Sequence, residues 1–387
     1  MTSISGNHTP AISDLQSANA VPSLVKSVAE TPSLAHNALC QADQLDAATW
    51  PGEHGPEKAL IKIYTTYGTE KQVTLRGRVL LDKQPSEARP GDSYLTNFIR
   101  NFGFLDSDEV RQAEVDVRFA GQTVRTTTDR DGLFEIQLDL DQSLSPGFHT
   151  VEAQLIPDPD NPLEIAPAKG QVVIQCQDDQ SFGVISDIDD TVQYTHVSNK
   201  WDAFKSLFLS NETTLQEVPG MAALYQALDQ ANDGCVDGDV SYLSGSPMNY
   251  VGRVENFLAA HDFPQGPIQL KNFGFRAGED NPIKQTDYKL NHLREMFETY
   301  PQKSFILFGD SGEKDPEIYT QIAQEYPEQV QAIFIHHVSS DAQDDPRFKA
   351  VTVIKSGLDA AKILHQNGTL PDAGLKSVQD AMTAPKN

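Results

Sequence analysis

The sequence is poor in cysteine, in basic residues and in long apolar runs. Its three cysteines, Cys40, Cys176 and Cys235, are far apart and form no CxxC pair, so we predict neither a disulfide framework nor a zinc site. No stretch reaches the roughly 18 apolar residues of a membrane span. The first residues lack the basic start and apolar core of a signal peptide. These absences predict a soluble, cytoplasmic protein.

Basic residues are outnumbered by acidic ones, 30 against 55, which gives a formal net charge of −25. A chain with this balance repels polyanions, so we predict no nucleic-acid partner and no broad electrostatic attraction to a membrane. Peripheral contact with a membrane through a local surface stays open. The hydrophobic content of 39% supports real cores, and 387 residues are enough for two domains with tails.

The pattern along the chain changes at three places. Residues 1–57 are rich in Ser, Ala, Asn, Pro and Thr and predict a flexible extension. Residues 58–177 contain alternating apolar stretches separated by Gly, Asp and Pro, which predicts a β-sandwich of the immunoglobulin-like type, with a helical insertion near 90–109. Residues 178–370 alternate strand and helix patterns, and 371–387 resemble a loose tail.

The alternation after residue 182 predicts an α/β fold with a doubly wound parallel sheet. Three of its expected strands end in polar segments: Asp187 to Thr191, Ser244 to Pro247, and Gly309 to Asp315. The carboxyl ends of parallel strands meet at one edge of the sheet, where such folds bind ligands. We therefore expect several carboxylates and a hydroxyl to converge there.

Converging carboxylates repel each other unless a cation neutralises them, and oxygen ligands of this kind suit Mg²⁺. A carboxylate beside Mg²⁺ can attack phosphorus and form an aspartyl-phosphate. A second carboxylate two residues later would serve as general acid and base, while a serine hydroxyl and a lysine ammonium would bind the phosphoryl oxygens.

The four motifs, DxDxT, a strand-end Ser, a later helix Lys and GDxxxxD, resemble those of the haloacid dehalogenase-like phosphatases. "GVISDIDDTV", "VSYLSGSPMNYVGRVENFL" and "FILFGDSGEKDPEIYTQIA" more closely resemble the catalytic domain of the actin-patch-associated phosphatidate phosphatases. The resemblance implies a haloacid dehalogenase-like fold with a small cap between residues 192 and 218. It also implies hydrolysis of phosphatidate to diacylglycerol and phosphate.

Carried over to this sequence, the resemblance makes Asp187 the nucleophile and Asp189 the general acid and base. Asp187, the main-chain carbonyl of Asp189, and Asp310 would hold Mg²⁺, with Asp315 supporting the metal directly or through water. Ser244 would bind a phosphoryl oxygen.

Other residues are less firmly placed by the resemblance. Lys289 is the expected motif lysine, and Lys271 and Lys284 are alternatives. Thr191, Gly245 and Lys271 are further candidates for binding the substrate. "IFIHHV" departs from the Arg-Asp pair of many relatives, which puts one substrate contact, at His336 and His337, in doubt.

Two competing interpretations are excluded by the residues present. A calcium loop fails because Val192 and Ser198 occupy the positions that need Gly and Glu. A serine hydrolase fails because no G-x-S-x-G elbow is present. Ser246 is expected to cap a helix beginning at Pro247. Two alternative functions stay open, a phosphatase of soluble phosphomonoesters and a non-catalytic phospholipid-binding adaptor. The oligomeric state is not predictable from the sequence.

Overall fold

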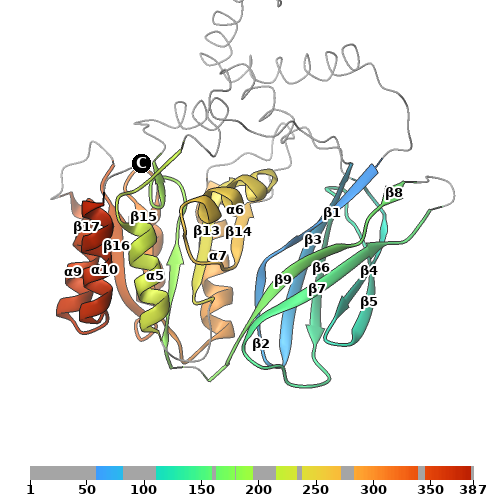
Figure 1. Cartoon of the computed structure of the whole chain (residues 1–387), viewed down its shortest axis with the longest axis horizontal. Coiled ribbons are helices and arrows are strands. Elements are labelled where there is room, and N and C mark those ends of the chain that lie inside the picture. Colours follow the sequence, from blue (N-terminus) through green and yellow to red (C-terminus); the bar gives the residue numbers. More distant parts are fainter. Residues whose placement is uncertain are drawn as a thin grey trace, which may run out of the picture.

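The computed structural model describes residues 58–81, 110–158, 163–178, 180–194, 215–232, 238–271, 283–338 and 345–384. The predicted N-terminal extension, the helical insertion and most of the predicted cap lie outside these residues. The described part contains a strand-rich region and a region built on a parallel sheet, which lie beside each other (Figure 1).

In the strand-rich region, hydrogen bonds between neighbouring strands join nine strands into one sheet. Its order is β5-β4-β7-β9-β2-β3-β1-β8, with β6 paired to β3. The strands are β1 (Lys58–Tyr64), β2 (Thr66–Thr69), β3 (Gln72–Leu81), β4 (Glu114–Phe119), β5 (Gln122–Thr127), β6 (Leu133–Asp139), β7 (Gly147–Leu155), β8 (Glu164–Ile165) and β9 (Ala168–Gln175). Most pairs are antiparallel, but β1 runs parallel to β8 and β2 parallel to β9.

The second sheet has six strands, all parallel, in the order β14-β13-β10-β15-β16-β17. These are β10 (Phe182–Ser186), β13 (Val240–Pro247), β14 (Ile268–Lys271), β15 (Ser304–Asp310), β16 (Val330–His336) and β17 (Thr352–Ile354). A short antiparallel pair, β11 (Gln193–Tyr194) and β12 (Gln216–Glu217), follows the end of β10. The central strands are apolar and buried on both faces, as strands of a covered parallel sheet must be.

The described helices pack around this second sheet. They are α5 (Met221–Ala231), α6 (Val251–Ala260), α7 (Ile283–Thr299), α8 (Asp315–Glu325), α9 (Gly357–Gln366) and α10 (Asp372–Thr383), with 3₁₀ turns η2 (Met248–Tyr250) and η3 (Pro346–Phe348). One apolar core joins the sheet to α5, α9 and α10, and another joins it to α7 and α8. Residues 372–383 therefore form a packed helix rather than part of a loose tail.

The predicted fold class is wrong in two respects. We expected a sandwich of antiparallel sheets, but hydrogen bonds join these strands into a single mixed sheet. The reason is that alternating periodicity identifies the strands but not the strands they pair with. The strict alternation of a doubly wound fold also fails in the described residues, where only η3 lies between β16 and β17, and α9 and α10 follow each other. The structure replaces the predicted haloacid dehalogenase-like class with a mixed sheet beside a separate parallel sheet.

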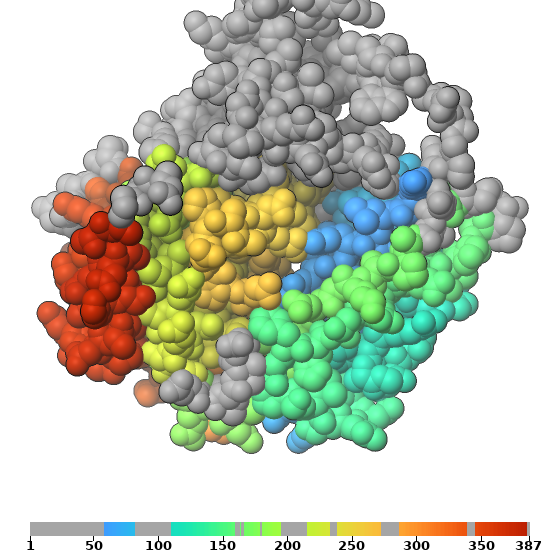
Figure 2. Space-filling view, viewed as in Figure 1, coloured from blue at the N-terminus to red at the C-terminus, as the bar shows by residue number. Residues whose placement is uncertain are grey.

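The two regions share an extensive junction. The space-filling view shows the blue and green strand-rich region in direct contact with the yellow segment that contains α6 (Figure 2). Tyr64 and Tyr67, from the nine-stranded sheet, belong to the two cores around the parallel sheet. Lys62 pairs with Glu255 of α6. The predicted domain boundary near residue 177 stays a prediction.

Candidate active site

The site lies at the carboxyl edge of the parallel sheet, where β10 and β15 end side by side. Ser186 is in register with Phe308, and the amide of Asp187 donates to the carbonyl of Phe308 at 2.9 Å. Asp187 thus follows the end of β10, and Asp310 is the last residue of β15. The parallel register therefore brings together two carboxylates that are 123 positions apart in the sequence.

Three carboxylates gather at this edge. One oxygen each of Asp187, Asp310 and Asp315 lies within 4.8 Å of the others, and all three residues are buried. Asp315 approaches closely because residue 309 is glycine: a Cβ there would lie 2.6 Å from the Cβ of Asp315. The turn from β15 into α8 therefore needs a residue without a side chain at this position.

Lys289 is the lysine that the structure brings to these carboxylates. Its ammonium donates to Asp187 Oδ1 at 2.8 Å and to Asp315 Oδ1 at 2.6 Å, and its side chain is 1% exposed. Lys271 ends β14, in register with Pro247, and Lys284 lies in the first turn of α7. Lys289 therefore supplies the buried cation from the middle of α7, and the side chain of Lys284 lies outside the described part of the structure.

The buried charges shift one another's proton affinity. Burial raises the pKa of Asp187 well above its usual range, and Asp315 and Asp310 raise it further, while Lys289 acts in the opposite direction. Burial alone would lower the pKa of Lys289, but Asp187 and Asp315 outweigh it and raise that pKa. Lys289 therefore stays protonated, and one ammonium faces more carboxylates than it can neutralise.

The chemistry of the donor set fits a divalent cation. Asp310 Oδ1 accepts from the amides of Gly312 and Glu313 at 2.5 and 3.1 Å. Its other oxygen, Oδ2, is buried and has no hydrogen-bond partner among the described residues. An unpaired buried carboxylate oxygen is costly unless a cation or proton binds it. Three converging carboxylates with one orphaned oxygen match the all-oxygen preference of Mg²⁺.

Asp189 occupies a different place from the three clustered carboxylates. Its Oδ2 accepts from Ser246 Oγ at 2.7 Å and from Ser244 Oγ at 3.3 Å, and its Oδ1 accepts from Gln193 Nε2 at 2.6 Å. Its carboxylate is thus held at the end of β13 and is not part of the cluster of Asp187, Asp310 and Asp315. This separation allows one carboxylate to handle a proton while the others hold a cation.

The remaining predicted residues lie close by. Thr191 is buried, and its hydroxyl is 3.5 Å from Asp187 Oδ2. Gly245 lies in β13 between the two serines that contact Asp189. The helix-capping role predicted for Ser246 is wrong, because β13 runs on to Pro247, a 3₁₀ turn follows, and the Ser246 hydroxyl binds Asp189 instead.

Sequence reasoning missed two contacts around the loop after β10, those of Gln193 and Tyr225, and named His336 only as the place of a substrate contact in doubt. Gln193 holds Asp189 from four residues away. His336 places Nδ1 2.6 Å from the carbonyl of Asp190, whose φ of 54° lies in the left-handed region. The buried hydroxyl oxygens of Tyr225 and Ser186 lie 2.7 Å apart. The Ser186 hydroxyl donates to the carbonyl of Asp187. The i, i+4 spacing of Asp189 and Gln193 was no signal for their contact, because that spacing indicates contact in a helix and residues 189–193 form a turn.

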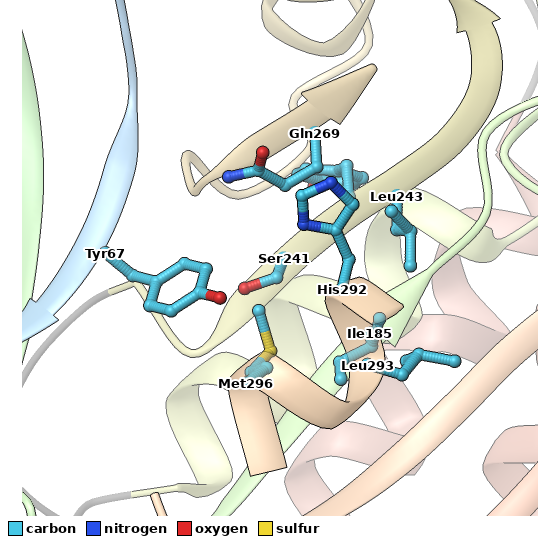
Figure 3. A pocket seen from close by; sticks show the side chains of 9 residues that line it. Tyr67, Ile185, Ser241, Leu243, Gln269, His292, Leu293 and Met296 are labelled. Atoms are coloured by element: carbon cyan, nitrogen blue, oxygen red, sulfur yellow. The ribbon is translucent and has the colours of Figure 1, made fainter. Parts of the chain in front are cut away.

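Two cavities of the structure are not this site. A cavity of about 10 Å³ lies where β2 meets β13, β14 and α7, and Tyr67 points across it toward Ser241 and Met296 (Figure 3). Its volume suits about one water molecule, not a phosphomonoester. A polar groove of about 630 Å³ lies between β2, β3 and α7, and none of the predicted site residues lines it.

Comparison with known families identifies the segment that carries this site. Residues 182–337 match the family model described as "Phosphatidate phosphatase APP1, catalytic domain". This match confirms the resemblance predicted from the motifs. The matched segment runs from the first residue of β10 to just beyond β16, so it contains all of the clustered carboxylates and Lys289.

Two fungal proteins match a segment of similar length. The "Phosphatidate phosphatase APP1" of Saccharomyces cerevisiae is 32% identical over 166 residues, which are 43% of this chain and 27% of that protein. An uncharacterized protein of Schizosaccharomyces pombe is 27% identical over 42% of this chain and 26% of its own length. The chain thus spans about a quarter of the length of the curated relatives it matches.

Comparison with solved structures adds no support for the fold. A carbohydrate acetylesterase from Xanthomonas citri aligns over 71% of this chain and 68% of its own, with 8% identity and a TM-score of 0.25. A score of this size does not indicate a shared fold.

Proposed function

We propose that this chain is a Mg²⁺-dependent phosphatase that hydrolyses phosphatidate to diacylglycerol and phosphate through an aspartyl-phosphate on Asp187. The observation that carries the proposal is the buried cluster of Asp187, Asp310 and Asp315 around Lys289, with one orphaned carboxylate oxygen. The family match over 182–337 supports phosphatidate as the substrate.

In the first step an Asp187 oxygen attacks phosphorus, and the bond from phosphorus to the diacylglycerol oxygen breaks. Asp189 gives its proton to the leaving oxygen. In the second step Asp189 takes a proton from water, whose oxygen attacks the same phosphorus. The bond to Asp187 breaks, and inorganic phosphate leaves with the free carboxylate restored.

The chain's own residues prepare both steps. Ser246, Ser244 and Gln193 hold the Asp189 carboxylate in one orientation. Lys289 contacts Asp187 and carries a positive charge that attracts the phosphoryl oxygens. Mg²⁺ held by the three clustered carboxylates would neutralise their charge and that of the phosphoryl group.

A phosphatase of soluble phosphomonoesters is the second candidate, because the site geometry alone does not distinguish the ester that carries the phosphate. Among the described residues, no helix has the length and apolar character to cross a bilayer. Phosphate release from phosphatidate in detergent micelles, compared with release from soluble phosphomonoesters at the same Mg²⁺ concentration, separates the two. Turnover of the soluble esters alone would refute the lipid assignment.

The nucleophile is tested by Asp187→Asn. The amide cannot form the acyl phosphate, so we expect phosphate release to fall by at least about 10³-fold, a loss on the order of 4 kcal/mol of transition-state stabilisation. The matched control is Asp141→Asn, which changes an exposed aspartate in the loop after β6 and should leave the rate unchanged. A circular dichroism melt checks that both variants fold. Full activity in the Asp187 variant would disprove the mechanism.

A further inference from the structure

Arg347 lies in η3, beyond residue 337 where the family match ends, yet it reaches the turn that carries Asp310 and Asp315. Its Nη1 donates to the carbonyl of Ser311 at 2.9 Å, and its Nη2 donates to the carbonyl of Glu313 at 2.6 Å. Nη2 also lies 2.9 Å from Glu317 Oε2 in the first turn of α8. One guanidinium thus binds two carbonyls of the turn and the helix that follows it.

The same turn is held from its other side by Asp310. The amides of Gly312 and Glu313 both donate to Asp310 Oδ1. Because that oxygen is occupied, Asp310 Oδ2 is the one left for a cation. The position of Oδ2 depends on the turn, and the carbonyls of this turn are bound by Arg347. Loss of the guanidinium would release two carbonyls at once.

We propose that Arg347 is a positioning residue that fixes the turn 311–314 and, through it, the orientation of the Asp310 carboxylate toward the cation. The part that concerns the cation rests on the proposed function. A planar guanidinium can donate to both carbonyls at once, whereas a lysine ammonium on a single flexible stem does not reproduce this fork. Groups that support metal ligands in this way typically change metal affinity about 10- to 100-fold when they are removed.

Hydrogen exchange of the metal-free protein tests the first part. In Arg347→Gln, we expect faster exchange of the amides of Gly312 and Glu313, because the turn that holds them against Asp310 loses its anchor. In Arg347→Lys, the exchange rates of these two amides should lie between those of wild type and Arg347→Gln. Peptides from β3 and α9 should exchange at wild-type rates, which shows that the variants fold. Equal exchange of the turn in all three proteins would overturn the proposal.

Calorimetric titration with Mg²⁺, without substrate, tests the second part. We expect the dissociation constant to rise about 10- to 100-fold in Arg347→Gln and less in Arg347→Lys. Glu317→Gln removes only the ion pair with α8, so its effect should stay within about twofold, as for a partly exposed pair. An unchanged Mg²⁺ affinity in Arg347→Gln would overturn the positioning role toward the cation.

Arg294→Gln is the matched control. Arg294 also makes a two-pronged contact with a glutamate of α8, at 2.7 and 2.8 Å to Glu325, but it contacts neither carbonyl of the turn in the described structure. It should change neither turn exchange nor Mg²⁺ affinity. If wild type takes up no Mg²⁺, the proposed function fails, and the exchange comparison still decides whether Arg347 fixes the turn.

Discussion

At the scale of single residues, the unusual feature is how little positive charge the site contains for its carboxylates. Lys289 is shared between Asp187 and Asp315, and Asp310 keeps one oxygen unpaired among the described residues. Such an arrangement is costly for the folded protein without a cation, because buried like charges repel each other in a low dielectric. Binding of the proposed cation would offset this cost, so we expect the stability of the protein to depend on Mg²⁺ and on pH.

Asp310 provides a test of that link. Burial raises the pKa of its carboxyl well above the usual range, and Asp315 and Glu313 raise it further, while Lys289 opposes them. A folded-state pKa above the unfolded one means that stability is fully present below the unfolded pKa and is lost as the pH rises through the folded pKa. For the metal-free protein, we therefore expect the free energy of unfolding of wild type to fall relative to that of Asp310→Asn above about pH 4.

Urea denaturation at a series of pH values measures this difference. Saturating Mg²⁺ should restore the stability of wild type at high pH, because a ligand that binds only the folded state stabilises it. The Asp310→Asn protein should respond much less. A stability difference that stays constant across the pH series would show that Asp310 carries no unfavourable charge.

Some residues of the site were predictable from the sequence and others were not, depending on whether strand ends or turns bring them together. Asp187, Asp310 and Asp315 could be found because the carboxyl ends of parallel strands lie at one edge of the sheet, a rule that requires only that the strands be parallel. Ser246, Gln193 and Arg347 could not be found in this way. Their contacts depend on turn geometry, such as the extension of β13 to Pro247 and the left-handed backbone at Asp190.

At the scale of elements, the parallel sheet was predictable from the sequence, whereas the strand pairing of the nine-stranded sheet was not. Buried apolar strands separated by helical patterns correctly predicted a parallel sheet, because both faces must be covered. The mixed pairing of the nine-stranded sheet was not predicted. Short alternating strands show which side chains share a face, but β1 with β8 and β2 with β9 are parallel pairs between segments distant in the sequence.

Asn232, the residue after α5, fixes the start of β10, the strand that ends just before Asp187. Its Oδ1 accepts from the amide of Phe182 at 3.1 Å, and its Nδ2 donates to the carbonyl of the same residue. Asn232→Ala leaves both backbone groups without these partners. We expect it to cost about 1–3 kcal/mol of unfolding free energy. Denaturant titration measures the loss, and Asn367→Ala, after α9, serves as the control, because the hydrogen bond that it removes, from the amide of Thr369, is exposed to water. Equal stability of the Asn232 variant and wild type would contradict this role.

At the scale of the whole molecule, the junction between the sheets contains a buried ion pair. Lys303, just before β15, donates to Asp239, just before β13, and their side chains are 1% and 8% exposed. Gln175 of β9 donates to Asp239 Oδ1 at 3.3 Å, so the pair joins the nine-stranded sheet to the parallel sheet. Tyr300 adds a second connection, through a 2.9 Å hydrogen bond to the carbonyl of Gly68.

Lys303→Met removes the cation and leaves the Asp239 carboxylate buried at this junction. Breaking a buried pair from one side typically costs about 3–5 kcal/mol, whereas replacing both partners with apolar residues is close to neutral. We therefore expect Lys303→Met to be strongly destabilised in urea, and the double variant Lys303→Met with Asp239→Leu to recover most of the loss. If the junction makes the molecule one cooperative unit, hydrogen exchange should accelerate in β9 as well as in β13 and β15. Acceleration confined to the parallel sheet would mean that the two sheets unfold independently.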